Sequence, residues 1–246
     1  MREWEKPLLK LPKTHKKMSY KIYFNKDGKI NTKESFKFIV KKASEFINSI
    51  HNPSILDIGC ATGDLVYYLS KMYPQAKCVG MDLRNDLLER ARKEVPNVKF
   101  IQSDISKKNS LMNEKFDIIF MVGVHPIFDD VFHVFDNVIN MLKENGQAHI
   151  FGIFNDNNID MIVKVKDSSA ESPWKVGWNL FSKKAVENYL KNKGLTCEFI
   201  DWEIPIDILK TDDPLRSWTF KDEHGKRMVI NGTGIIHTFS LLLISR

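Results

Sequence analysis

The chain has 246 residues, 43% of them hydrophobic and 11% aromatic, which is enough to bury a full core in one large domain or in one domain with a cap. Three cysteines without a C-x-x-C pair argue against a disulfide framework or a zinc site. No apolar run is long enough to span a bilayer, and the charged N-terminus has no apolar signal core. We therefore expect a cytoplasmic protein without a bound metal.

The net charge of +6 is unevenly distributed along the chain. Residues 1–42 carry 13 Lys and Arg against four acids, a net +9, so the remaining residues carry −3. A basic segment beside an acidic body is able to attract a phosphate-bearing substrate or a nucleic acid. A solvated lysine face explains the same pattern, and the sequence leaves both interpretations open.

Residues 1–32 are polar and weakly periodic, which predicts an irregular or partly helical arm. A helix is expected next, with Thr32 as its N-cap and Asn52-Pro53 as its end. Its apolar face would consist of Phe36, Val40, Ala43, Ile47 and Ile50. We interpret residues 1–50 as a basic arm and cap helix over one side of a cleft, and residues 51–246 as the main domain.

The centre of the sequence pattern is a strand, a glycine-bearing turn and a helix. Residues 55–58 are typical of a buried parallel strand, the turn contains Gly59 and Gly63, and residues 65–72 are typical of a helix. In an open α/β sheet such a turn lies at the carboxyl edge, where ligands bind, and glycine lets a ligand approach the main chain. An uncompensated carboxylate is costly at the end of an apolar strand. We therefore expect Asp57 to accept hydrogen bonds from the turn or to meet a cation.

Two interpretations compete for this turn. The dinucleotide fingerprint G-x-G-x-x-G would place a pyrophosphate on the helix N-terminus, but its three positions hold Gly59, Ala61 and Asp64, and the acid would repel a pyrophosphate. Asp57, Gly59, Ala61 and Gly63 instead resemble motif I, D-x-G-x-G-x-G, of the class I S-adenosylmethionine-dependent methyltransferases, with alanine for the middle glycine. That motif suits a ligand with a cationic amino group and a sulfonium, so the turn favours the methyltransferase.

Strands and helices alternate after the turn, which predicts a parallel sheet. Further strands are expected at residues 77–82, 98–101, 116–122, 147–154, 195–205 and 235–244. Helices are expected at residues 85–93 and 181–193, and along the apolar stripe Phe128, Phe132, Phe135, Ile139 and Leu142. The resemblance implies an α/β fold with a seven-stranded, mostly parallel, doubly wound sheet and an N-terminal helical arm. It also implies that the last strand is antiparallel and lies beside the fifth.

Two further acids follow predicted strands, and the match to the methyltransferases extends to them. Asp82 resembles the acid that binds the ribose, with Leu83 beside the adenine; Asp104 resembles the residue that meets the adenine amine, with Ile105 packing on the ring. A carboxylate accepts such hydroxyl and amine donors well. The resemblance thus places the cofactor against Asp57, Gly59, Cys60, Ala61, Gly63, Asp82, Leu83, Asp104, Ile105 and Val122.

The loop after the fourth predicted strand contains His125, Asp129 and Asp130. In the methyltransferases this loop lies below the transferable methyl group. His125 is the candidate general base because imidazole titrates near neutral pH, although it also fits a role in shaping the pocket. Asp129 is a candidate substrate ligand, and either aspartate is able to cap the next helix.

Residues 155–180 are polar and lack clear periodicity, so we expect a substrate lid there, with Trp178 as a candidate substrate contact. The C-terminal part resembles small-molecule methyltransferases of surface-polysaccharide gene clusters. The sequence thus predicts methyl transfer from S-adenosylmethionine to a small, phosphate-bearing metabolite, such as a nucleotide-linked sugar or a polysaccharide precursor, with O-methylation favoured over N-methylation. The alternatives are an RNA methyltransferase that uses the basic arm, which we consider less favoured, and a non-catalytic protein that binds S-adenosylmethionine.

Overall fold

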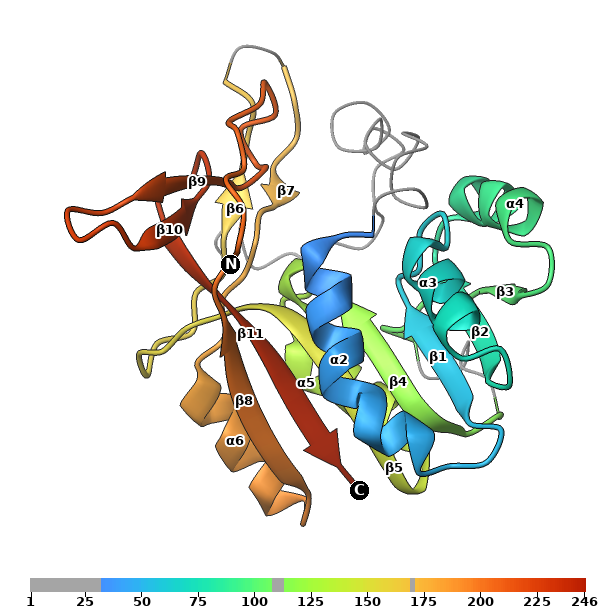
Figure 1. The fold of residues 1–246 in the computed structure, drawn as a ribbon. Helices are drawn as coiled ribbons and strands as arrows, with labels where there is room; N and C mark the ends of the chain where they lie inside the picture. The colour runs from blue at the N-terminus through green and yellow to red at the C-terminus, as the bar shows by residue number, and fades with distance from the viewer. Residues whose placement is uncertain (1–31, 108–112, 169–170) are drawn as a thin grey trace, which may run out of the picture.

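The computed structural model describes residues 32–107, 113–168 and 171–246. Within them, seven strands form a central sheet in the order β3-β2-β1-β4-β5-β11-β8 (Figure 1). Their bounds are β1 Ser54–Ile58, β2 Lys77–Asp82, β3 Lys99–Gln102, β4 Phe116–Val122, β5 Leu142–Phe154, β8 Thr196–Trp202 and β11 Ile236–Ser245. Strands β1 to β5 pair in parallel, and β11 is antiparallel to both β5 and β8. The predicted doubly wound sheet and the place of its last strand are confirmed.

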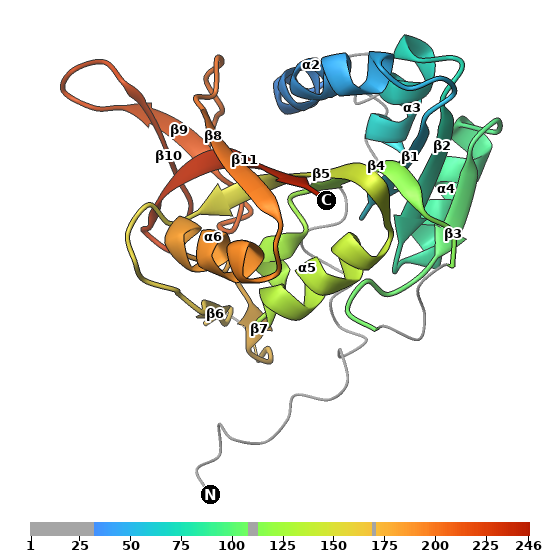
Figure 2. The same cartoon turned by 90° about the horizontal axis from the view of Figure 1, so that it is seen from below.

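Helices cover both faces of the sheet because each carries one apolar stripe (Figure 2). Helices α2 (Glu34–Asn48), α3 (Asp64–Met72) and α4 (Asn85–Glu94) pack on one face, and α5 (Val131–Asn140) and α6 (Lys183–Asn192) on the other. Strand β4 is almost fully buried between these layers, as its continuous apolar run predicts. No helix of the described segments is both long and apolar enough to cross a membrane.

Two antiparallel hairpins extend from the carboxyl edge of the sheet (Figure 1). Strands β6 (Lys164–Val165) and β7 (Lys175–Val176) pair within the predicted lid, which we call the insertion (residues 155–180). Strands β9 (Trp218–Lys221) and β10 (Arg227–Ile230) prolong the sheet from the first residues of β11. The insertion therefore contains strands that its sequence does not reveal, because two-residue strands are too short to show a period.

Some boundaries differ from the prediction. Lys33 stands at the N-cap of α2, and no side chain caps that helix, so the predicted Thr32 cap is wrong; Ile50 lies beyond the helix end. Helix α5 is shorter than the predicted stripe, because Phe128 precedes it and Leu142 begins β5. The stripe residues within the helix, Phe132, Phe135 and Ile139, do pack on the core. The predicted arm lies outside the described residues, apart from Thr32.

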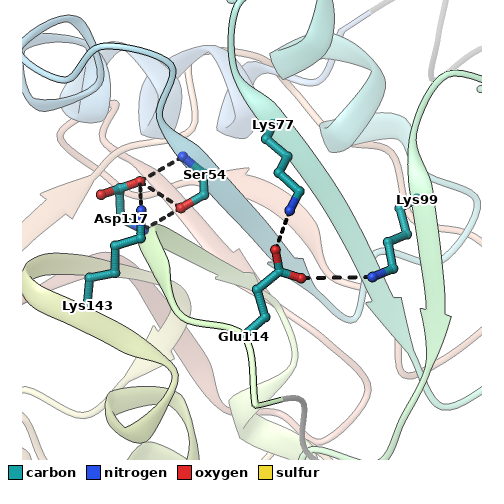
Figure 3. Close-up of polar contacts among 6 residues, drawn as sticks. All are labelled: Ser54, Lys77, Lys99, Glu114, Asp117 and Lys143. Atoms are coloured by element: carbon teal, nitrogen blue, oxygen red, sulfur yellow. Dashed lines mark hydrogen bonds and ion pairs between the residues drawn. The ribbon is translucent and has the colours of Figure 1, made fainter.

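Ion pairs bind the amino edge of the sheet together (Figure 3). Asp117 of β4 accepts hydrogen bonds from the Ser54 backbone N–H (2.8 Å), the Ser54 hydroxyl (2.6 Å) and Lys143 Nζ (2.8 Å). Glu114 pairs with Lys77 and with Lys99. Asp117 and Glu114 at this edge therefore both have cationic partners.

Candidate functional site

The glycine turn crosses from β1 to α3 and is held against β2. The backbone N–H groups of Gly59 and Cys60 both donate to the Met81 carbonyl, at 2.7 and 3.0 Å. Gly59 (φ +74°) and Gly63 (φ +82°) adopt left-handed conformations that favour glycine. Ala61 is also left-handed, at φ +48°, in the position where the resembling motif has its middle glycine. Burial raises the pKa of the Cys60 thiol, so this side chain is a neutral part of the wall.

The turn lies directly against the loop that follows β4. A Cβ placed on Gly59 would stand 2.3 Å from Val124 Cγ2, closer than real side chains approach. The N–H of Gly123 donates to the Phe151 carbonyl (2.8 Å), which holds the loop to β5. The motif I turn and the loop with the candidate reactive residues thus form one continuous wall at the carboxyl edge. Val124 was not among the predicted site residues, since an isolated apolar loop residue carries no local signal.

Asp57 is buried and, within the described part of the chain, its carboxylate accepts no hydrogen bond. Burial raises its pKa well above the ordinary value, and the neighbouring charges of Asp82 and Asp64 add to the shift, while Lys33 opposes it. Desolvation and like charges both disfavour the ionised form. The expectation that the turn supplies hydrogen bonds to Asp57 is therefore wrong, and the alternative, a cationic partner, remains.

Asp82 stands at the end of β2 and binds two backbone groups around the turn. Its Oδ2 accepts from the Ala61 N–H and its Oδ1 from the Arg84 N–H, both at 2.9 Å. Burial raises the pKa of Asp82, and these two hydrogen bonds act against that rise. Leu83 beside it is 45% exposed, which leaves an apolar side chain on the surface next to the acid.

The loop after β3 is connected to the same edge, because the Ser103 N–H donates to the Asp82 carbonyl at 3.0 Å. Asp104 accepts from the Ser106 N–H (3.0 Å) and hydroxyl (2.6 Å) and pairs with Lys107 at 3.3 Å. Burial acts to raise the pKa of Asp104, but these hydrogen bonds outweigh it and the pKa is lowered. Ile105 is buried, and its carbonyl accepts from the buried Asn137 of α5 (2.8 Å).

His125 begins a single turn of 3-10 helix, His125–Ile127, and is completely buried. Its Nε2 lies 3.0 Å from the Ile153 carbonyl, and its ring stacks on Phe154 with centroids 4.4 Å apart. Burial lowers the pKa of His125 to about 4, against the hydrogen bond to Ile153 that raises it. The Nδ1 atom is buried and has no partner in the described segments. The general-base role stays a prediction, and this geometry favours the alternative, a role in shaping the pocket.

The two aspartates of this loop have separate structural roles. Asp130 caps α5 by accepting from the His133 N–H at 3.1 Å. Asp129 pairs with Lys164 of the insertion at 2.5 Å and accepts from Asn179 at 3.1 Å. The structure thus brings Asp129, a predicted substrate ligand, to the insertion. Trp178 precedes Asn179 there and is half-buried.

Asn179 is a connecting residue that sequence reasoning missed. It is fully buried; its N–H donates to the Pro126 carbonyl (2.8 Å) and its Nδ2 to the Phe128 carbonyl (2.9 Å). Its Oδ1 accepts from the Val163 N–H at 2.8 Å. One side chain therefore ties both limbs of the insertion to the loop after β4. An asparagine in a polar segment has no pattern that would reveal this role.

Two cavities lie at opposite edges of the sheet. The larger, about 660 Å³, lies at the amino edge, where Arg246 donates to the Ile139 and Leu142 carbonyls and Lys143 pairs with Asp117. Arg246 thus binds carbonyl groups at and just after the end of α5, and Lys143 binds a neighbouring acid. The second, about 310 Å³, lies at the carboxyl edge beside the end of β5. Of these two cavities in the described segments, the second is the one that shares an edge with the glycine turn.

Comparisons with known proteins agree with this arrangement. Residues 55–146, less than half of the chain, match a family model described as a methyltransferase domain. The chain is 39% identical over 101 residues to a malonyl-[acyl-carrier protein] O-methyltransferase of Halalkalibacterium halodurans, covering 38% of this chain and 36% of that protein. It is 30% identical over 92 residues to a trans-aconitate 2-methyltransferase of Afipia carboxidovorans, covering 37% and 35%.

A similar fold occurs in the crystal structure of an S-adenosylmethionine-dependent methyltransferase from Clostridium acetobutylicum. Its TM-score is 0.52 at 18% identity, over 83% of this chain and 89% of that one. The chain spans less than half the length of the curated relatives it matches. The residues that match the family model contain the glycine turn, Asp82, Asp104 and β4. Residues 55–146 therefore match a methyltransferase domain, and the chain shares its fold with a protein that is named as an S-adenosylmethionine-dependent methyltransferase.

Proposed function

We propose that the protein transfers the methyl group of S-adenosylmethionine to an oxygen atom of a small metabolite. The observation that carries this proposal is the buried carboxylate of Asp57, which has no hydrogen bond in the described segments and lies in the field of Asp82 and Asp64. Buried charges require a partner. A ligand with an ammonium and a sulfonium group supplies positive charge to such a site, whereas a pyrophosphate adds further repulsion.

The remaining groups of the turn fit the same ligand. Each carboxylate oxygen of Asp82 accepts one backbone hydrogen bond, and a carboxylate oxygen has a second acceptor position for a ribose hydroxyl. The exposed Leu83 side chain beside it offers an apolar surface to the adenine ring. The left-handed Gly59 and Gly63 keep side chains away from the main chain where the ligand would approach.

S-adenosylmethionine supplies an electrophilic methyl group and its own leaving group. The protein therefore has to hold donor and acceptor in line, and positioning of this kind accounts for a large part of catalysis. Val124 and the loop after β4 form the wall where the acceptor would meet the donor, and Asn179 holds that loop to the insertion. Oxygen as the acceptor atom is supported by the relative that is named as an O-methyltransferase.

The finer substrate assignment is a phosphate-bearing metabolite, such as a nucleotide-linked sugar or polysaccharide precursor. Its support is the net charge of +9 in residues 1–42, most of which precede the described part of the chain. Lys33 and Lys37 at the start of α2 pair with Asp64 and Glu34. Competition of a nucleotide-linked sugar with the acceptor, but not with the cofactor, would support this assignment.

Calorimetric titration tests the cofactor assignment. Wild type should bind S-adenosylmethionine and not NAD, and Asp82→Ala should weaken binding by the two hydrogen bonds lost, each about 1.5–3 kcal/mol. Asp117→Ala is the matched control, since Asp117 also accepts backbone and side-chain hydrogen bonds but lies at the opposite edge. Equal affinity in Asp82→Ala and Asp117→Ala, or tight NAD binding, would refute the proposal. Mass analysis of a cell extract methylated with labelled cofactor then identifies the product.

A further inference from the structure

The cavity at the carboxyl edge lies between the end of β5, the start of β11 and the insertion. Its volume is about 310 Å³, at the lower end of the range for small-molecule sites. It is lined by Phe154, Asn155, Asp156, Asn157, Ile159, Met161, Leu180, Ile235, Ile236 and Thr238. No lysine or arginine is among these described lining residues.

Hydrocarbon side chains form most of the wall. Phe154 and Leu180 are buried beneath it, at 1% and 3% exposure, whereas Ile159 and Ile236 remain 60% and 49% exposed. A ligand that covers exposed isoleucines beside a buried apolar floor is stabilised, because apolar surface is removed from water. The wall is therefore suited to an apolar group.

The polar lining residues already bind one another. Asp156 pairs with Lys183 at 2.5 Å and accepts from the Thr238 hydroxyl at 3.2 Å. Asn155 donates to the Ile159 carbonyl (2.8 Å) and accepts from the Asn157 N–H (3.1 Å). The carboxylate of Asp156 is thus neutralised within the protein. A phosphate placed here would meet this acid without a lining cation to offset its charge.

One residue that lines the cavity also packs on the loop after β4. Phe154 stacks on His125, the first residue of the 3-10 turn in that loop. The backbones of Met161 and Leu180 are hydrogen-bonded to each other at 2.8 and 3.0 Å, and the neighbouring Asn179 holds the loop at Pro126. Strand β5 is the direct neighbour of β4, and adjacent strands lie about 4.8 Å apart. The cavity and the loop after β4 therefore lie at the ends of neighbouring strands, on the same edge of the sheet.

We propose that this cavity binds the hydrocarbon part, aliphatic or aromatic, of the methyl acceptor and thereby selects acceptors that carry one. The inference rests on the proposed methyl transfer for the identity of the ligand as acceptor. The residues that line the cavity lie outside the glycine turn. The two exposed isoleucines act as its specificity-determining surface, and Phe154, stacked on the buried His125, forms part of its floor.

Binding of simple probes tests the site without knowledge of the acceptor. Indole and n-hexanol are titrated into the full chain in the presence of S-adenosylhomocysteine and followed by saturation-transfer NMR. Ile159→Asp and Ile236→Asp should each weaken probe binding at least tenfold. Leu209→Asp is the matched control, because Leu209 is 83% exposed and lies outside the cavity. This variant should bind the probes with the affinity of wild type.

Equal probe affinity in Ile159→Asp and Leu209→Asp would overturn the proposal, as would displacement of the probes by millimolar inorganic phosphate. Because both isoleucines are on the surface, the variants should fold, and unchanged circular dichroism verifies this. Affinity for S-adenosylmethionine is measured separately on the same variants. If wild type does not bind S-adenosylmethionine, the proposed function is refuted, whereas the probe-binding result for the cavity is unaffected.

Discussion

Gly59 lies so close to Val124 that a methyl group on its Cα would stand 2.3 Å from Val124 Cγ2. The two residues belong to the turn after β1 and the loop after β4, which form the wall of the proposed cofactor site. The absence of a side chain at Gly59 is therefore what allows these two segments to meet. A left-handed backbone at φ +74° adds a second requirement for glycine.

Gly59→Ala should destabilise the fold and weaken cofactor binding. The left-handed conformation costs roughly 1–2 kcal/mol for alanine, and overpacking against Val124 adds about 1–3 kcal/mol. Gly194→Ala is the matched control, because Gly194 has φ +73° but nothing within 4 Å of an added Cβ. Urea unfolding should show a larger loss for Gly59→Ala, partly restored by Val124→Ala. Equal losses at the two glycines would mean that contact with Val124 is unimportant.

Asp57→Asn should stabilise the cofactor-free protein while it weakens S-adenosylmethionine binding. The folded state raises the pKa of Asp57, mainly by burial. Folding therefore disfavours its ionised form, and this residue lowers stability as the pH rises from the ordinary value near 3.8 through the raised value. The stability gain of Asp57→Asn should be small in acid and grow toward neutral pH.

Urea unfolding of both proteins from pH 4 to pH 7 measures this difference. Asp104 and Asp117 have lowered pKa values, so they contribute stability of the opposite sign, which is lost as the pH falls. The comparison therefore uses the difference between variant and wild type at each pH. A difference that does not change with pH would show that Asp57 is not a buried carboxyl group with a raised pKa.

Two substitutions at His125 distinguish a catalytic role of this residue from a packing role. Its pKa of about 4 means that it is neutral at pH 7 and destabilises the folded state only as the pH falls from about 6.5 toward 4. His125→Gln retains a donor for the Ile153 carbonyl and should leave turnover at pH 7 within tenfold of wild type. His125→Ala leaves a cavity under Phe154 and should cost about 2–5 kcal/mol of stability.

The control is His149→Gln, since His149 is also buried with a lowered pKa but lies in β5 rather than in the loop. A general base typically contributes 10²–10⁴-fold. If His125→Gln loses that factor on the true acceptor while His149→Gln does not, and the pH dependence of kcat loses a limb, then His125 acts as the base predicted from the sequence.

Asn179→Ala should release the insertion from the loop after β4. The substitution leaves the Val163 N–H and the Phe128 carbonyl without their partner. Each of these groups that stays buried should lower the stability of the fold by about 1–3 kcal/mol. Amide hydrogen exchange should accelerate between residues 155 and 168 and stay unchanged in β1 and β4. Asn137→Ala is the control, because Asn137 is equally buried but binds Ile105. Fast exchange of the insertion in both variants would contradict a specific connection through Asn179.

Ligand addition extends the same measurement to the predicted lid role. If the insertion and residues 1–32 close over donor and acceptor, exchange in both segments should slow when S-adenosylhomocysteine and acceptor are added. Exchange that is the same with and without ligands would remove the lid role from both. The wild-type protein in the cofactor-only state provides the reference.

Local sequence patterns determined the central fold. The buried run of β4, the helical stripe of α2 and the short turns between strands predict their elements, because periods of 2 and 3.6 residues follow directly from backbone geometry. The glycine turn and the acids at the ends of β1 and β2 were predictable for a similar reason. Parallel strands place their carboxyl ends at one edge, so residues at strand ends meet without further information.

Tertiary structure alone decided how those residues are used. Gly59 meets Val124 across 65 positions and Asn179 binds Pro126 across 53, and no local period encodes contacts at such separations. His125 is a candidate base by residue type, yet stacking on Phe154 and the bond to Ile153 place it in the core. Asp57 and Asp117 are both strand acids in sequence, but only Asp117 has partners at its edge of the sheet. Burial and charge depend on which distant segments pack together, and packing is a property of the whole chain.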